Sequence, residues 1–365
     1  MTASPPAEAL LDLAMRIQQV PAPTFDEAQR AAFVRDCFIE TRLSDVAIDD
    51  TGNVHARLAG SGGAPLVVSA HLDTVFSEGT DLKIVRSADR ISGPGIGDNS
   101  LGVAALFGLA WLLRERELRP PGDLWLVANT CEEGLGDLRG MRAVVDRFGA
   151  APCCYLVLEG MAFGHVYHRA IGVRRYRIAV HAAGGHAWSD YGRPSAIHEL
   201  AGIVTALTSI ELPSEPRTTM NVGRITGGTT VNTLAAEAWI ELDLRSESTD
   251  VLRALVVRVE TLVRRFARPG VEVAMDVIGD RPAGELPPDH PLIGLAVECL
   301  RKQGADATLT SGSTDANVPL SRGHPALALG ITVGGGAHTT NEYILTEPVG
   351  RGMEQVFQFV TRVWR

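Results

Sequence analysis

The sequence has few cysteines and no run of basic residues. Its five cysteines are odd in number and scattered along a chain of 365 residues, so we expect reduced thiols rather than a disulfide framework. The formal net charge is −9. Because no basic stretch is available to neutralise phosphates, we expect no nucleic-acid partner.

Long apolar runs and targeting signals are also missing. No apolar stretch reaches the roughly 20 residues that a membrane-spanning helix needs, and residues 1–12 lack the basic and apolar regions of a signal peptide. The sequence contains no internal repeat and no low-complexity tract. We therefore expect a globular, cytoplasmic protein that binds no membrane.

What the sequence does contain is a regular alternation of strand and helix patterns. Short apolar runs such as Leu66–Val68, bounded by glycine and proline, predict strands buried in a parallel sheet. Strands that alternate with helices predict an α/β fold with a doubly wound, mostly parallel sheet. From about residue 170 the order becomes strand-helix-strand-strand-helix-strand, which is the split βαβ, or ferredoxin-like, arrangement of an α+β domain.

These patterns divide the chain into three segments and two domains. Residues 1–169 and 283–365 are expected to form one catalytic domain, and residues 170–282 an inserted lid or dimerisation domain. The proline-rich stretch 280–291 marks the return to the first domain.

Two local expectations concern the first segment. Thr24 precedes Glu27 by three residues, which predicts a capping box for a helix that runs to about Ile39. His55 lies in an alternating strand pattern, and we expect it at the surface.

Polar residues follow the strand that contains Leu66–Val68. His71 and Asp73 lie at its end, where open α/β sheets bind their ligands. Two residues apart on an extended segment, their side chains point the same way. This is the pattern of a metal-ligating histidine with an orienting acid. By itself a His-x-Asp pair is more often a surface pair, so the hypothesis needs partners elsewhere in the chain.

Five further side chains supply such partners. They are Asp98 in the glycine-rich loop 93–100, the adjacent Glu132 and Glu133, then Glu159 and His338. Two histidines and three carboxylates suit a pair of divalent ions with one bridging carboxylate. We expect Zn²⁺ first, with Co²⁺ and Mn²⁺ as alternatives. Such a pair polarises a carbonyl and generates hydroxide near neutral pH, and a glutamate left beside the ions can act as general base.

In this order the motifs resemble those of the M20 metallopeptidases and deacylases, over nearly the whole chain. The likeness rests on His71-Leu72-Asp73-Thr74-Val75 and on a Gly-x-Gly-x-x-Asp-Asn pattern at residues 93–99. The resemblance implies that Asp73 orients His71 and that Asp98 bridges the two metals. It implies that Glu132 is the general base. It pairs His71 with Glu159 on one metal, and Glu133 with His338 on the other.

The inserted domain carries three further matches. His186 resembles a lid histidine that, in dimeric members, reaches into the partner's site to polarise the scissile carbonyl. The resemblance therefore implies a homodimer joined through this domain. Asn232 ends a Gly-Gly-Thr-x-x-Asn segment and Arg245 an Asp-x-Arg segment, and both are implied to hold polar groups of the substrate, often a carboxylate. Trp188 and Tyr191 replace small residues that usually follow the histidine, which leaves the substrate class open.

We therefore expect a dizinc hydrolase that cleaves an amide bond in a small peptide or an N-acyl amino acid. Glu132 would act as base on a water between the metals. Glu159 favours a deacylase or carboxypeptidase, because the family's aminopeptidases tend to have Asp there. The residues around His186 and Asp315 look more like peptidase T, so a di- or tripeptide aminopeptidase is the alternative. Asp315 itself is left outside the catalytic set.

The alternative from another class is a non-catalytic binding module of the same fold. A single missing ligand would be enough for an inactive site, whereas this sequence retains every ligand and Glu132. We therefore favour the enzyme.

Overall fold

The structure is a computed structural model that describes residues 5–364. The chain divides into two compact units. Unit 1 combines the residues up to Ala170 with those from Glu285 onward, and unit 2 runs from Ile171 to Gly284. Each unit has a hydrophobic core of its own, as expected of domains that bury their apolar residues separately.

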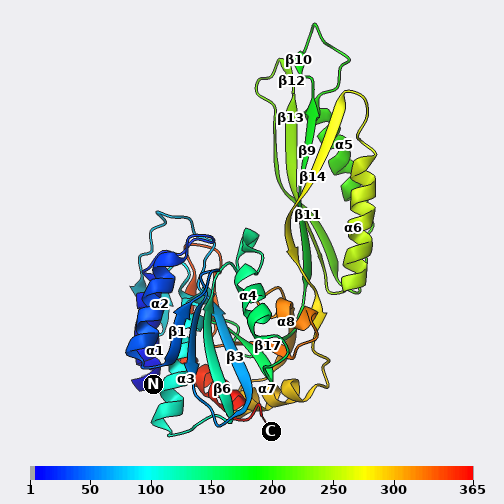
Figure 1. Ribbon diagram of the computed structural model, residues 1–365. Coiled ribbons are helices and arrows are strands. Elements are labelled where there is room, and N and C mark those ends of the chain that lie inside the picture. Colours follow the sequence, from blue (N-terminus) through cyan, green and yellow to red (C-terminus); the bar gives the residue numbers. More distant parts are fainter. Residues whose placement is uncertain (1–4, 365) are drawn as a thin grey trace. The chain divides into compact units, whose positions relative to one another are not determined.

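Unit 1 is built on a mixed, mostly parallel sheet (Figure 1). Its strands are β1 (Ser44–Ile48), β2 (Val54–Leu58), β3 (Gly63–His71), β6 (Gly122–Asn129), β7 (Cys154–Glu159), β8 (His165–Ala170), β16 (Thr308–Gly312) and β17 (Ala326–Gly330). They lie in the order β1-β2-β6-β3-β7-β17-β8, with β16 beside β8. Neighbours from β6 through β17 are parallel. The predicted α/β fold class is confirmed.

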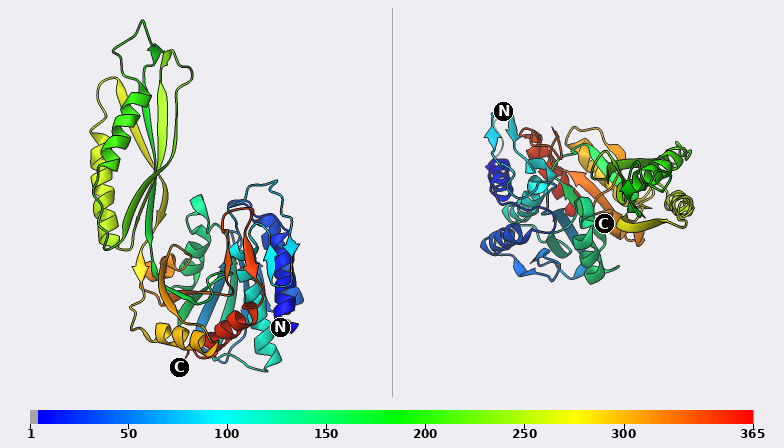
Figure 2. Two further views of the ribbon diagram at one scale, coloured as in Figure 1. Left: turned by 180° about the vertical axis from the view of Figure 1, so that it is seen from behind. Right: turned by 90° about the horizontal axis from the view of Figure 1, so that it is seen from above.

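The helices of unit 1 lie on both faces of this sheet (Figure 1 and Figure 2). They are α1 (Pro5–Gln18), α2 (Ala28–Glu40), α3 (Leu101–Glu115), α4 (Arg139–Phe148), α7 (Pro291–Lys302), α8 (Asn317–Ser321) and α9 (Val349–Val360), with the short turns η1 (Ile96–Ser100) and η2 (Gly134–Gly136). Strand β3 is hydrogen-bonded on both sides and covered on both faces, which is why Leu66, Val67 and Val68 are fully buried.

One helical stretch departs from the expectation that no apolar segment is long enough to span a membrane. Residues Ile96–Glu115 meet that criterion by length and composition, and 89% of the apolar window is buried inside the protein. This stretch comprises η1 and α3, and α3 packs against α1, α9 and the strands β3 and β7. Its apolar surface is accounted for by the core of unit 1.

A small second sheet brings two distant loops of unit 1 together. Its strands are β4 (Val85–Arg86), β5 (Arg90–Ser92), β18 (Gly334–Gly335) and β19 (Tyr343–Leu345), in the order β18-β19-β5-β4. Tyr343 lies opposite Ser92 in the antiparallel pair of β19 and β5. The glycine-rich loop after β5 is therefore placed beside the loop between β18 and β19.

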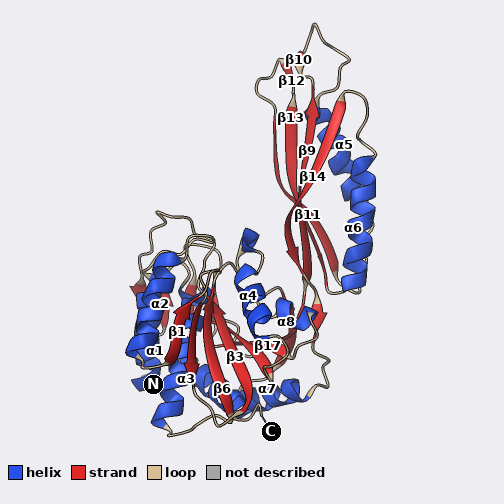
Figure 3. Cartoon of the chain, in the orientation of Figure 1, coloured by secondary structure: helices blue, strands red, loops and turns tan. Residues whose placement is uncertain are grey.

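Unit 2 is a four-stranded antiparallel sheet with two helices on one face (Figure 3). Its elements are β9 (Gly172–Ala182), α5 (Ala196–Thr208), β11 (Thr218–Gly227), β13 (Glu237–Ser246), α6 (Thr249–Arg264) and β14 (Val271–Arg281), in the sheet order β11-β13-β9-β14. The predicted order of strands and helices is confirmed. The short strands β10 (Gly185–His186) and β12 (Thr233–Leu234) pair with each other. Where the chain returns to unit 1, β15 (Gly284–Glu285) pairs with β8 at the edge of the large sheet.

The helix predicted to run to about Ile39 is α2, which ends at Glu40, but the capping box and the surface position of His55 are wrong. Thr24 forms no capping box with Glu27, because its hydroxyl donates to Asp73 Oδ2 at 2.9 Å and Glu27 accepts from the backbone of Cys131. His55 is fully buried, and its Nε2 lies 2.9 Å from Asp49 Oδ2, which satisfies that ring nitrogen. The five cysteines are free thiols, as expected.

Candidate metal centre

The centre begins at the end of β3, where His71 and Asp73 are almost completely buried. Asp73 accepts the backbone N–H groups of Glu132 and Glu133, one on each carboxylate oxygen and both at 2.9 Å. His71 Nδ1 lies 3.0 Å from the Asp73 carbonyl oxygen, which leaves Nε2 for other partners. Both carboxylate oxygens of Asp73 accept backbone N–H groups. Asp73 therefore positions Glu132 and Glu133 and does not itself offer a free ligand atom.

Asp98 lies between the two predicted histidines. Its Oδ1 is 3.1 Å from His71 Nε2, and its Oδ2 is 3.2 Å from His338 Nε2. Glu159 Oε2 lies 3.9 Å from His71 Nε2, and Glu133 Oε1 lies 3.1 Å from His338 Nε2. The five predicted ligands therefore form two groups that share Asp98.

The donor set fits divalent metal ions. Ligand atoms of His71, Asp98 and Glu133 all lie within 4.8 Å of one another. Imidazole nitrogens with carboxylate oxygens are ligands that suit Zn²⁺, and Co²⁺ and Mn²⁺ also accept them. His338 is the most exposed member, with 54% of its side chain accessible, so one side of the centre is open to small molecules.

The electrostatics of the centre also favour a cation. Burial raises the pKa of Glu159 well above its ordinary value, and the charges of Asp98, Glu132 and Asp315 raise it further against the opposing effect of His71. Hydrogen bonds to Asp98 and Glu133 raise the pKa of His338 to about 10. Burial lowers the pKa of His71, but Asp73, Asp98 and Glu132 outweigh this and raise it well above its ordinary value. The centre thus concentrates negative charge that a divalent cation would offset.

Three supporting residues lie outside the predicted site: Asn99 and Glu342, which sequence reasoning did not single out, and Asp315, which it considered and left out. Asn99 donates to Glu159 Oε2 at 3.2 Å and accepts the N–H of Gly160 at 2.8 Å, so it holds the end of β7. Asp315 is fully buried and accepts from Asn129 at 2.7 Å, at the end of β6. Glu342 holds the glycine-rich loop by three hydrogen bonds. Asn99 had a local signal, because it follows Asp98 in the recognised motif, and Asp315 had one in the segment that looks like peptidase T, whereas Glu342 had none.

Unit 2 brings His186 and Asn232 to one end of its sheet. His186 lies opposite Thr233 in the β10–β12 pair, and Ala187 donates its N–H to the Asn232 carbonyl at 2.9 Å. His186 Nδ1 accepts the N–H groups of Trp188 and Ser189, at 3.2 and 3.3 Å. Because Nδ1 is an acceptor, the ring proton of the neutral form is on Nε2, which makes Nε2 a hydrogen-bond donor.

Arg245 lies at the other end of the same sheet. It is opposite Val173, whereas the end that continues into β10 is at Ala182. From Glu237, near Asn232, to Arg245 the strand rises about 26 Å. One copy of the chain therefore cannot bind a single carboxylate with both Asn232 and Arg245.

Arg245 has a carboxylate partner within its own sheet. Its Nε donates to Asp243 Oδ2 at 2.7 Å, and Asp243 in turn accepts from Arg175. The charge of Arg245 is therefore offset within unit 2, without a carboxylate of the substrate. However, 42% of the Arg245 side chain is exposed, and its two Nη groups make no hydrogen bond within residues 5–364.

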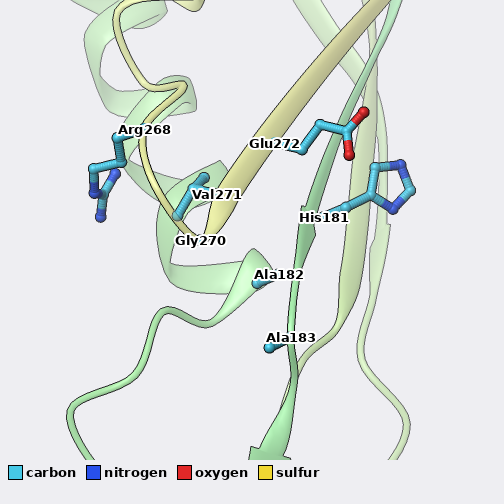
Figure 4. Close-up of a pocket in the computed structure, with 7 residues that line it drawn as sticks. All are labelled: His181, Ala182, Ala183, Arg268, Gly270, Val271 and Glu272. Atoms are coloured by element: carbon cyan, nitrogen blue, oxygen red, sulfur yellow. The ribbon is translucent and has the colours of Figure 1, made fainter.

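Two hollows on the surface of unit 2 lie near the end of the sheet that carries His186. One is lined in part by Gly185, Gly228, Thr229 and Thr233, which belong to the segments that carry His186 and Asn232. The second hollow is lined by none of the predicted site residues. Figure 4 shows that His181 and Glu272 project together on one side of it, from neighbouring strands, while Arg268 lies on the other side.

Histidines and carboxylates gathered near the carboxyl ends of parallel strands are typical of metal-dependent enzymes of the α/β class. Residues 67–362 match the family described as "Peptidase family M20/M25/M40", and the chain belongs to this family of peptidases and amidohydrolases.

Curated relatives and solved structures agree with this assignment. "Peptidase M20 domain-containing protein C757.05c" of Schizosaccharomyces pombe is 31% identical over 211 residues, which are 55% of this chain and only 50% of that protein. Carboxypeptidase G2 of a Pseudomonas species is 25% identical over 321 residues, 84% of this chain and 76% of that protein.

Aminopeptidase PepT of Bacillus cereus has the same fold, with a TM-score of 0.80 at 24% identity over 98% of this chain and 99% of that one. YXEP of Bacillus subtilis, described as a dinuclear metal-binding peptidase of the M20 family, has a TM-score of 0.71 at 16% identity, with 98% of each chain covered.

Proposed function

We propose that this enzyme hydrolyses an amide bond in a small peptide or an N-acyl amino acid, with the help of two divalent metal ions. Zn²⁺ is the metal that we favour for both. The observation that carries the proposal is the position of Asp98. Each of its carboxylate oxygens meets a different histidine, at 3.1 and 3.2 Å. A carboxylate shared in this way suits a bridging ligand.

The proposed ligands are His71 and Glu159 for one ion, His338 and Glu133 for the other, and Asp98 for both. When bound, the ions would polarise the substrate carbonyl and lower the pKa of water at the site. The protein's contribution is to hold the ligands ready. Asp73 orients His71 and the Glu132–Glu133 backbone, and Asn99 holds Glu159.

Glu132 is the proposed general base. It is adjacent to Glu133 and its backbone N–H is fixed by Asp73, so its side chain can face the centre while Glu133 serves as a ligand. In the proposed reaction it removes a proton from the attacking water and then transfers that proton to the leaving amine. Its burial, with 6% of the residue exposed, limits competition from solvent.

His186 is proposed to donate a hydrogen bond to the scissile carbonyl. The turn from His186 to Asp190 holds its ring with Nε2 as the donor. In this proposal it acts in a homodimer joined through unit 2, on the substrate bound by the partner chain. The long edge strand β11, on which most residues are exposed, offers unpaired backbone groups to a second copy.

Within this reaction class we favour a carboxypeptidase or deacylase. Glu159 and the likeness to carboxypeptidase G2 support that choice. The alternative is a peptidase-T-like aminopeptidase, which the residues around His186 and the fold shared with PepT favour.

A substrate panel tests both choices. The purified protein, depleted of metal and reloaded with Zn²⁺, would be assayed against N-acyl amino acids, N-blocked dipeptides, and free di- and tripeptides. We expect hydrolysis of N-blocked substrates that is abolished by chelation. Exclusive hydrolysis of peptides with a free amino terminus would select the aminopeptidase. A folded protein that binds no metal and hydrolyses none of them would contradict the proposal.

A further inference from the structure

Glu342 is a fully buried carboxylate to which the proposed reaction assigns no part. It lies four residues after His338, just before β19. Its Oε2 accepts the N–H of Gly95 at 3.1 Å, and its Oε1 accepts the N–H groups of Gly97 and Asp98 at 2.7 and 2.8 Å. Its own carbonyl oxygen accepts the N–H of Gly93 at 2.9 Å. One residue therefore holds the glycine-rich loop at four points.

At Gly95 and Gly97 the loop has no room for side chains that could hold it. A Cβ at Gly97 would come within 2.7 Å of Met161 Cγ, and one at Gly95 within 2.9 Å of Thr74 Cγ2. The N–H groups of Gly95, Gly97 and Asp98 instead share one carboxyl group, that of Glu342. Gln18, which donates to the Pro94 carbonyl at 2.8 Å, is a further contact of the loop.

Through these bonds Glu342 connects the two loops that carry Asp98 and His338. It fixes the backbone of Asp98 directly, and its own N–H donates to Thr339, the residue after His338. Asp98 has to stay between His71 and His338 to reach both. We call this set of hydrogen bonds from the glycine-rich loop to Glu342 the clamp. Its loss would let the loop move and would separate the two groups of ligands.

We propose that Glu342 is the positioning residue that holds Asp98 in its bridging place, so that the centre binds two ions rather than one. This inference rests on the metal centre of the proposed function. It concerns the assembly of that centre and is independent of the substrate.

The test is Glu342→Gln, which keeps the size of the side chain but replaces one acceptor oxygen by a donor. That NH₂ group would face a backbone N–H of the loop. The number of bound Co²⁺ and Zn²⁺ ions and their dissociation constants would be measured after dialysis, together with the visible spectrum of the Co²⁺ form. We expect at least about tenfold weaker binding of one ion, as for other residues that orient ligands, and a changed Co²⁺ spectrum.

Glu260→Gln is the matched control, because it makes the same change at a carboxylate that accepts from Tyr176 in unit 2. It should bind both ions as the unaltered protein does. Glu342→Asp retains the charge but shortens the side chain, and it should also weaken the binding of one ion. Two ions bound with unaltered affinity and an unaltered spectrum in both Glu342 variants would overturn the inference, even if the unaltered enzyme hydrolyses amides. Weakened binding in an enzyme that hydrolyses none of the panel would support the clamp and contradict the proposed function.

Discussion

At the residue scale, two aspartates organise the centre in different ways. Asp73 has both oxygens committed to the N–H groups of Glu132 and Glu133, so it sets the direction of the adjacent glutamates. Asp98 has its two oxygens turned toward His71 and His338. The two aspartates thus have different roles, because the carboxylate of Asp73 accepts from backbone N–H groups and that of Asp98 lies beside two imidazoles.

Glu132 gives the most direct test of the proposed chemistry. Glu132→Gln should keep both metal ions, because none of the proposed ligands is changed, and should reduce kcat by at least about 10²-fold, the usual size of a general-base contribution. Metal content and kcat would be measured on the same preparation. Near-normal turnover would show that another group takes the proton.

Arg245 tests the recognition of a substrate carboxylate. Its Nη groups are not engaged within residues 5–364, and it is half exposed. We expect a free acid to be preferred over its amide, and Arg245→Ala to lose about ten- to a hundredfold in kcat/KM on the free acid, the value of a hydrogen bond to a charged group. Arg245→Lys should not restore it, because a point charge lacks the planar fork. If Arg245→Ala keeps the same preference for the free acid over its amide, Arg245 serves only to pair with Asp243.

At the element scale, the turn between β1 and β2 shows how a polar network anchors a hairpin. Asp49 accepts the N–H groups of Thr51 and Asn53, and its other oxygen meets Asn53 Nδ2 and His55 Nε2. Asn53 then contacts Gly140 and accepts the N–H of Thr130 at the end of β6. The hairpin is thereby fixed to the strand that leads into the Glu132–Glu133 segment.

Asp49 predicts a pH-dependent stability. Burial raises its pKa, but hydrogen bonds from His55 and Asn53 outweigh this and lower it to about 2. A lowered folded-state pKa stabilises the protein above the unfolded value near 4, and this contribution is lost as the pH falls toward 2. Because the side chain is a quarter exposed, we expect Asp49→Asn to lower the free energy of unfolding by about 1–2 kcal/mol at pH 7, and by less at pH 3.

Asp50→Asn is the control for this measurement, because Asp50 is exposed and its side chain makes no hydrogen bond within the described chain. Denaturant unfolding at pH 7 and pH 3 would give the four differences. Equal losses for Asp49→Asn at both pH values would show that the charge of Asp49 contributes nothing.

At the scale of the whole molecule, the proposed site residues are divided between the two units. The proposed ligands and Glu132 belong to unit 1, whereas His186, Asn232 and Arg245 belong to unit 2. Asn232 and Arg245 lie at opposite ends of one sheet. A second copy of the chain is one way in which residues from both ends could serve the same substrate.

Complementation between two inactive variants tests the homodimer. His186→Ala and Glu132→Gln chains should each be inactive, and a mixture should recover part of the activity. In the mixed dimer one site receives Glu132 from one chain and His186 from the other. Subunit exchange would be verified with differently tagged chains. If exchange occurs and activity does not return, His186 acts within its own chain or outside the reaction.

The sequence by itself determined the fold class, the order of elements in both units and the candidate ligands. It could do so because strand and helix periods are local, and because parallel strands bring their carboxyl ends to one edge, where His71, Glu132 and Glu159 follow their strands. The family pattern then supplied Asp98 and His338, which lie on loops. Local spacing was sufficient for these predictions.

Only the tertiary structure decided how polar side chains are satisfied. Thr24 prefers Asp73, 49 residues away, to the local capping box, and Glu342 meets Gly95 across 247 residues. Even the near pairs His55–Asp49 and Arg245–Asp243 required the fold, because the local patterns did not decide between an exposed and a paired side chain. Buried polar groups must find partners wherever the folded chain provides them. Partners as distant as Asp73 from Thr24, or Glu342 from Gly95, are separated by long stretches of chain, so no local pattern in the sequence specifies them.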